Sequence, residues 1–210
     1  MSEQDVGGGL SMPIEKLAIV NWLGEIGVRG VESRLQRLLA DGITVRAEEA
    51  KAGYADAESA TAQFAADQRV GVRVKMPNQP LGQVLVLFPP ASANNAAAFM
   101  LQHAGVDPAT ATYEMARDAL TELCNMISNG YMDEWADLFD QHIAAAAPSP
   151  VENTEQELMR LVATKDDLGL YLASRFTIPD YDVEATIYLF PKEETFVNAI
   201  SRLDLNVISA

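Results

Sequence analysis

Two apolar runs with the same ending decide the fold: VLVLFPP at residues 84–90 and TIYLFPK at residues 186–192. Each run has the length and the aliphatic and aromatic content of a β-strand and ends in Phe-Pro. The Phe-Pro pairs, at Phe88 and Phe190, lie 102 residues apart in a chain of 210. This spacing predicts an internal duplication, with one copy in each half of the chain.

The segments around the first run predict one unit of the duplication. Apolar residues recur at helical spacing from Pro13 to about Ala40. Strand-like ITVRA, VGVRVKM and QVLVLF follow, with a turn at PNQPLG, and a helix is expected from Ala91 to His103. Between these strands, residues 47–67 are rich in alanine, and their pattern leaves helix, loop and irregular strand open.

The second half repeats this order. A long helix is expected from Asp107-Pro108 to about Ala145, followed by strand-like LGLYLASRFTI, a turn at PDYD, VEATIYLF and a last helix to about Leu203. Two half-units with open sheet edges gain by joining. We therefore expect one domain over residues 1–210 of mixed α/β composition, more narrowly α+β: two pseudo-twofold helix–strand–hairpin–helix units, about 12–104 and 105–205, around a shared, mainly antiparallel sheet. Residues 1–11 are expected to be disordered.

Composition and charge exclude several classes of protein. The net charge of −15, with scattered Lys and Arg, disfavours nucleic acid as a partner. The longest apolar runs are strand-sized, so membrane insertion is not expected, and the N-terminus has no secretory pattern. With a single cysteine the chain has no internal disulfide, and a cytoplasmic location is predicted. The acid excess fits solubility, a saline cytoplasm or a surface for a basic partner.

The long helix of the second half carries an unusual polar stripe. At about 100° per residue, six polar residues fall within roughly 80° of one face: Asp118, Glu122, Asn125, Asn129, Asp133 and Asp140. Such a stripe is often only a solvated face. Two mid-helix Asn residues, which are poor helix formers, instead favour a functional face. Tyr131 and Trp135 fall on the opposite, apolar side and are predicted to be core residues.

The spacing Asp118-x3-Glu122-x2-Asn125-x22-Pro148 resembles the signature of the CheC, CheX and FliY family of response-regulator phosphatases. The resemblance covers nearly the whole chain. It implies two pseudo-symmetric halves, each contributing a long helix, with both long helices on one face of the shared sheet. Proteins similar to CheC carry a signature in each half. Aligning NWLGEIGV with DALTELCN puts Asn21, Glu25 and Val28 opposite the second-half residues and predicts a silent first site, since Val28 cannot orient water.

The resemblance implies a chemistry as well. The substrate is phosphorylated CheY or another receiver domain, which supplies its own phospho-Asp, Mg²⁺ and Lys. Asn125 is expected to orient the attacking water and Glu122 to pair with the receiver's Lys, while Asp118 adds docking charge and Pro148 is structural. A non-catalytic adaptor similar to FliM, or a partner of CheD, is the alternative function. Monomer and homodimer both remain open.

No other catalytic or metal site is expected. His103 and His142 have no neighbouring ligand residues at metal-binding spacing, so this chain is predicted to bind no metal of its own. It has neither a P-loop nor a dinucleotide fingerprint, and no other cofactor of its own is predicted. Cys124 adjoins Asn125 in sequence but belongs to the apolar side of the helix, where a packed thiol is expected rather than a nucleophile.

Overall fold

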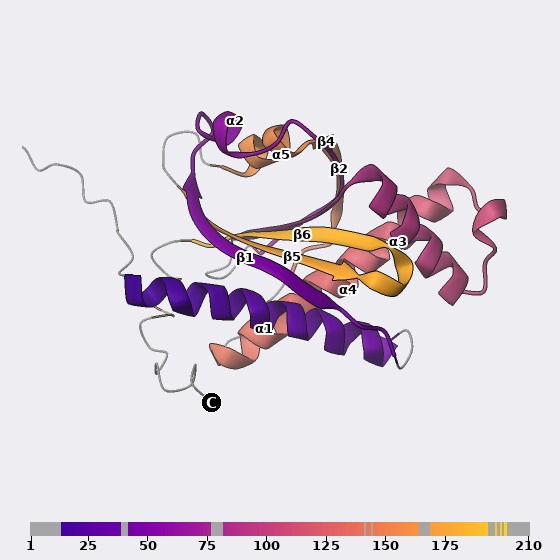
Figure 1. Ribbon diagram of the computed structural model, residues 1–210, viewed down its shortest axis with the longest axis horizontal. Coiled ribbons are helices and arrows are strands. Elements are labelled where there is room, and N and C mark those ends of the chain that lie inside the picture. The colour runs from indigo at the N-terminus through magenta and orange to yellow at the C-terminus, as the bar shows by residue number, and fades with distance from the viewer. Residues whose placement is uncertain are drawn as a thin grey trace, which may run out of the picture.

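The computed structural model describes residues 14–38, 42–76, 82–140, 142–143, 145–163, 169–192, 196, 198 and 200. In this part of the chain six strands form one antiparallel sheet in the order β1-β5-β6-β3-β2-β4 (Figure 1). Their bounds are β1 Arg46–Ala55, β2 Gln68–Lys75, β3 Gln83–Phe88, β4 Ser149–Thr154, β5 Gly169–Ile178 and β6 Val183–Phe190. The α helices are α1 Ile14–Leu38, α2 Ala60–Gln63, α3 Pro90–His103, α4 Tyr113–Leu138 and α5 Glu155–Val162, with 3-10 turns η1 Pro108–Thr110 and η2 Pro179–Tyr181.

The sheet has the predicted pseudo-twofold order. β3 and β6, which hold the two Phe-Pro runs, pair at its centre, with Val86 opposite Ile187. The hairpin β2-β3 of the first half is extended by β4 of the second half, and the hairpin β5-β6 is extended by β1 of the first. Each half therefore completes its three strands with a strand from the other. The predicted duplicated α+β fold around a shared antiparallel sheet is confirmed.

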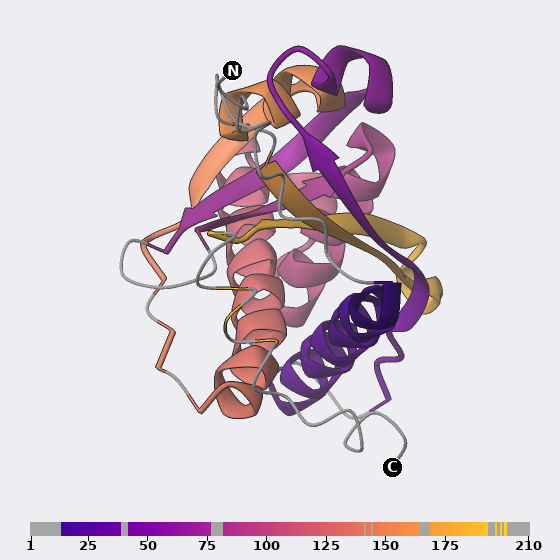
Figure 2. The same cartoon turned by 90° about the vertical axis from the view of Figure 1, so that its left-hand side faces the viewer.

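The two long helices lie together on one face of the sheet, as expected. Figure 1 shows α1 and α4 on the side of the sheet opposite to α2 and α5, and Figure 2 shows α1 and α4 side by side beneath it. Between these helices and the sheet lies a large buried cluster, which includes Leu23, Val31, Leu35, Val86, Leu123, Ile127, Tyr131, Trp135 and Ile187. None of the described helices combines the length and apolar character needed to cross a membrane.

The alanine-rich segment that the sequence left open resolves into two elements. Residues 46–55 form the edge strand β1, and a single turn of helix, α2, follows at Ala60–Gln63. β1 owes its strand conformation to pairing with β5, from Arg46 opposite Thr177 to Ala55 opposite Gly169. Because this partner comes from the other half of the chain, tertiary pairing overrides the weak local strand preference of alanine.

Some predicted helix limits are wrong. The long second-half helix begins at Tyr113, not at Asp107-Pro108, because Asp107 caps the separate turn η1 and Thr112 caps α4. It ends at Leu138 rather than near Ala145, since Asp140 adopts a left-handed backbone with φ 48° that stops the helix. Most of the PNQPLG turn, residues 1–11 and the predicted helix beyond Ile200 lie outside the described residues.

Candidate functional site

The polar stripe of α4 forms an exposed face. Asp118 and Glu122 are exposed and Asn125 is half-buried, with Thr112 accepting a hydrogen bond from the Met115 backbone N–H at 3.3 Å to begin the helix. Residues four and three apart on a helix lie on the same face. The structure thus brings these three predicted site residues together on one surface, with Asn125 the most enclosed of them.

Asn129 holds the amide of Asn125. Its Nδ2 donates a hydrogen bond to Oδ1 of Asn125 at 3.3 Å. Since an amide oxygen has two lone pairs, Asn125 keeps further capacity to bind water while its orientation is restrained. The sequence analysis placed Asn129 on the stripe but did not predict this contact, although the i, i+4 spacing of the two amides could have suggested it.

Asp118 has a weaker setting. Its carboxylate lies 3.6 Å from the Arg117 guanidinium, and its side chain is 74% exposed. An ion pair this exposed contributes little to stability, because water and salt screen it. Asp118 therefore contributes surface charge one turn ahead of Glu122 rather than a fixed contact.

The opposite face of α4 fixes how the site is presented. Tyr131 and Trp135 are buried, as predicted. The Tyr131 hydroxyl lies 2.9 Å from Ser174 Oγ on β5, and Trp135 Nε1 donates to the Leu23 carbonyl of α1 at 3.0 Å. Because these two hydrogen bonds join α4 to the sheet and to α1, they prevent the helix from rotating and keep Asn125 on its outer edge.

Cys124 lies among the packed residues and is fully buried. Burial raises the pKa of its thiol far above the ordinary value, so almost no thiolate exists near neutral pH. We expect the native protein to resist alkylation by iodoacetamide at pH 8 and to be modified fully in denaturant, with mass spectrometry as the readout. Rapid alkylation of the folded protein would show that the thiol is accessible.

Pro148 lies at the other end of the signature, directly before β4. β4 is an edge strand that pairs only with β2 among the described strands, with Pro150 opposite Val72. Proline lacks a backbone N–H and is suited to such an edge. The structural role of Pro148 stays a prediction.

The two long helices cross at a pair of glycines. A Cβ on Gly30 of α1 would overlap the Gly130 carbonyl oxygen, and a Cβ on Gly130 would lie 2.7 Å from the Gly30 carbonyl oxygen. When two helices related by a twofold axis cross, they cross on that axis. The two residues that face each other at the crossing are therefore at equivalent positions in the two halves. Each residue of α1 therefore corresponds to the residue of α4 that is 100 positions later, close to the 102 positions that separate the two Phe-Pro pairs.

This equivalence corrects the alignment predicted from sequence by three residues, nearly one helical turn. The predicted offset of 97 paired Asn125 with Val28, by matching the acids Glu25 and Glu122. The crossing instead pairs Asn125 with Glu25 and Glu122 with Trp22. Burial agrees, because Val28 is 3% exposed and corresponds to Ser128, which is 1% exposed.

The exposed positions of α1 fit the same alignment. Arg29 corresponds to half-buried Asn129, and exposed Ser33 corresponds to exposed Asp133. Asn21, assigned to the degenerate first site, is exposed but has no counterpart among the signature residues in this alignment. Glu25 is exposed and lies 3.9 Å from Arg29. The first helix thus presents an acid where the second presents an amide.

The different burial of Val28 and Glu25 predicts different stabilities for two substitutions in α1. Val28→Asn would bury an amide in the core and is expected to lower the free energy of unfolding by about 1–3 kcal/mol. Glu25→Asn changes an exposed side chain and is expected to alter it by less than about 0.5 kcal/mol. Urea unfolding of both variants measures the difference, and equal stabilities would show that the side chain at position 28 does not lie in the core.

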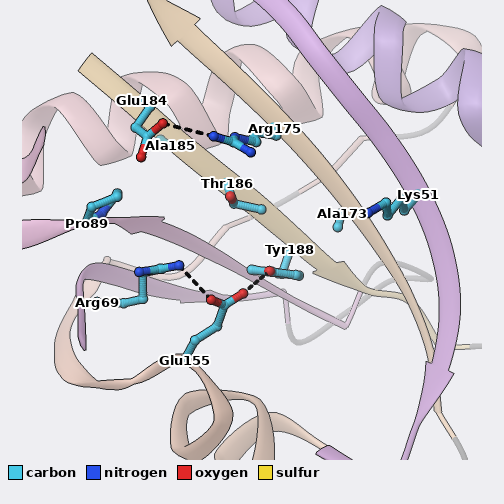
Figure 3. A pocket seen from close by; sticks show the side chains of 10 residues that line it. All are labelled: Lys51, Arg69, Pro89, Glu155, Ala173, Arg175, Glu184, Ala185, Thr186 and Tyr188. Atoms are coloured by element: carbon cyan, nitrogen blue, oxygen red, sulfur yellow. Dashed lines mark hydrogen bonds and ion pairs between the residues drawn. The ribbon is translucent and has the colours of Figure 1, made fainter. Parts of the chain in front are cut away.

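A second polar cluster lies on the opposite face of the sheet, in a hollow of about 260 Å³ (Figure 3). Buried Glu155, the first residue of α5, accepts a hydrogen bond from the Tyr188 hydroxyl and forms an ion pair with Arg69 at 2.9 Å. Near them Arg175 and Glu184 pair at 3.0 Å. Because Glu155 begins α5 while Arg69 and Tyr188 lie on β2 and β6, these contacts join α5 to the sheet. Among the described residues, no three His, Cys, Asp or Glu side chains are grouped to hold a metal.

Comparisons with known proteins agree with this architecture. Residues 70–169, which hold the whole signature, match the family described as chemotaxis phosphatase CheX. The chain is 29% identical over 193 residues to CheC1 of Halobacterium salinarum, whose name assigns it provisionally as a CheY-P phosphatase; the match covers 90% of this chain and 97% of that protein.

Solved structures show the same fold at low sequence identity. FliY of Thermotoga maritima matches with a TM-score of 0.66 at 12% identity, covering 91% of this chain and 97% of that one. The FliM middle domain of H. pylori matches with a TM-score of 0.61 at 7% identity, covering 91% of this chain and all of that one. With the signature on α4 and the duplicated sheet, these matches make the chain similar to the CheC, CheX and FliY proteins in sequence pattern and in fold.

Proposed function

We propose that this protein hydrolyses the aspartyl phosphate of a CheY-like response regulator. The observation that carries the proposal is the amide of Asn125, restrained by Asn129 and placed one helical turn from exposed Glu122. A non-catalytic adaptor of the same fold, which binds CheD or acts like FliM, would not need a restrained amide at that position. The likeness to CheC1 over 90% of the chain supports the same substrate.

The mechanism divides the work between the two proteins. Hydrolysis is an in-line attack of water on phosphorus, and catalysis rests on positioning and on stabilising charge on the phosphoryl oxygens. The receiver contributes the phospho-Asp, its own Mg²⁺ and a Lys that neutralises phosphoryl charge. This chain contributes the water, held by the carboxamide of Asn125 in line with the bond that breaks. An amide is a weak base, so Asn125 orients the water rather than removing its proton.

Glu122 sets the position of the receiver. It follows Asp118 by one turn and precedes Asn125 by three residues, so its carboxylate and the amide lie about 4.5 Å apart along the helix axis. A carboxylate at that distance pairs with the receiver's Lys while the amide enters the site beside it. Such a charge pair fixes how the receiver is aligned on α4 and speeds its association, and it adds less to the affinity. CheY-like receiver domains act in the cytoplasm, so a receiver as substrate places the proposed activity there.

The test is a dephosphorylation assay. A CheY from the same cell is phosphorylated with a small phosphodonor, and the loss of phosphoryl-CheY is followed with and without this protein. We expect faster loss in its presence, in proportion to its concentration. A loss rate equal to spontaneous hydrolysis with every receiver of the cell would overturn the proposal. Stable binding without hydrolysis would favour the adaptor function.

A further inference from the structure

An exposed thioether lies beside the site. Among the described residues four large apolar side chains are exposed: Leu38 54%, Tyr113 75%, Met115 40% and Leu161 57%. Leu38 and Leu161 belong to α1 and α5, while the other two lie in the first turn of α4. Two of the four therefore lie on the helix that holds the signature, but only one of them lies on the same face as its acids.

Met115 shares the face of the site and Tyr113 does not. At about 100° per residue, Met115 lies roughly 20° from Glu122 and 60° from Asp118 around the helix. Tyr113 lies about 160° from Met115, on the far side. Met115 is thus the large exposed apolar side chain that the described α4 presents beside its acids.

An apolar group in this position has a physical consequence for binding. The acidic side chains around it gain little net affinity, since their attraction to a partner is offset by desolvation and screened by salt. Methionine is enriched in protein interfaces and adapts its shape to a partner, and burying it removes apolar surface from water. Exposed apolar surface next to charged groups is the arrangement of an interface anchor with a polar rim.

We propose that Met115 is the apolar anchor of the docking surface and sets the affinity for the phosphorylated receiver, whose contact surface extends onto the first turn of α4. This inference rests on the proposed function. Met115 and Asn125 are ten residues apart, or about 15 Å along the helix, which lies within the width of a standard interface. The receiver must then present an apolar patch about 15 Å from its phosphorylated Asp.

The experiment separates affinity from turnover. Steady-state hydrolysis of phosphoryl-CheY by Met115→Ala is expected to show a KM raised about tenfold with kcat unchanged, because an anchor lost equally from substrate and transition state changes binding alone. Met115→Leu restores apolar surface and is expected to recover most of the affinity. Leu161→Ala, which removes an exposed apolar side chain from α5 on the other side of the sheet, is the matched control and is expected to leave KM unchanged.

Binding to beryllofluoride-activated CheY, measured by calorimetry in the Asn125→Ala background, tests the anchor without hydrolysis. We expect Met115→Ala to raise Kd about tenfold there as well. An unchanged Kd and KM, or a fall in kcat at constant KM, would overturn the anchor. If no variant or parent hydrolyses phosphoryl-CheY while Kd still responds to Met115→Ala, the proposed function fails and the docking surface stands.

Discussion

Asn125→Ala is expected to reduce hydrolysis of phosphoryl-CheY nearly to the spontaneous rate, by roughly 10²-fold or more in kcat, because it removes the group that orients the water. The amide lies at the edge of the exposed face, restrained at 3.3 Å by Asn129. Asn125 is only half-buried, so the free energy of unfolding should change little. Single-turnover loss of phosphoryl-CheY at saturating enzyme isolates the chemical step.

Two further variants complete this test. Asn129→Ala leaves the amide in place but removes its restraint, and an intermediate loss of kcat is expected. Asn94→Ala, an exposed amide on α3 away from the stripe, is the matched control and should hydrolyse at the parent rate. Full activity of Asn125→Ala would exclude the assigned role, whatever the behaviour of the controls.

Gly30→Val is expected to lower the free energy of unfolding by about 3 kcal/mol or more. This is the largest loss of stability that we expect from a substitution in α1 or α4. Replacing a helical glycine normally gains helix propensity. Here the new side chain meets the Gly130 backbone of α4, which cannot move aside as a flexible side chain can. The helices must separate, and the cluster around Leu23 and Trp135 loses packing.

Urea unfolding followed by circular dichroism measures this loss. Ser33→Ala, an exposed change one turn further along α1, is the control and should leave the unfolding midpoint nearly unchanged. A Gly30→Val protein as stable as the parent would mean that the helices do not approach so closely. The pseudo-twofold alignment would then lose its support as well.

The local pattern was sufficient where one segment carried the whole signal. The runs ending at Phe88 and Phe190 predicted strands and a duplication, because alternating and continuous apolar residues show directly which surfaces are buried. The inward side of α4 was predicted for the same reason, since a 3.6-residue period places Tyr131 and Trp135 opposite the polar stripe. The pairing of β3 with β6 confirms the strands, and the burial of Tyr131 and Trp135 confirms the inward side of α4.

The pattern failed where a partner from the other half decided the outcome. Strand β1 was undecided because its partner β5 lies more than 100 residues away. The alignment of the two long helices was wrong because chemical likeness favoured matching Glu25 with Glu122, whereas the crossing at Gly30 and Gly130 matches Glu25 with Asn125. A glycine has no side chain, so the crossing at Gly30 and Gly130 adds nothing to the apolar pattern from which helix packing is predicted.

The sequence by itself determined the duplicated α+β fold, the helix that holds Asp118, Glu122 and Asn125, and the family signature, since spacing along one helix fixes which side chains share a face. Only the tertiary structure decided that each half completes its sheet with a strand from the other, that Asn129 restrains Asn125, and that an acid occupies the equivalent position on α1. These features depend on where side chains meet in space. Such contacts are set by packing between distant segments, which one chain's local pattern does not encode.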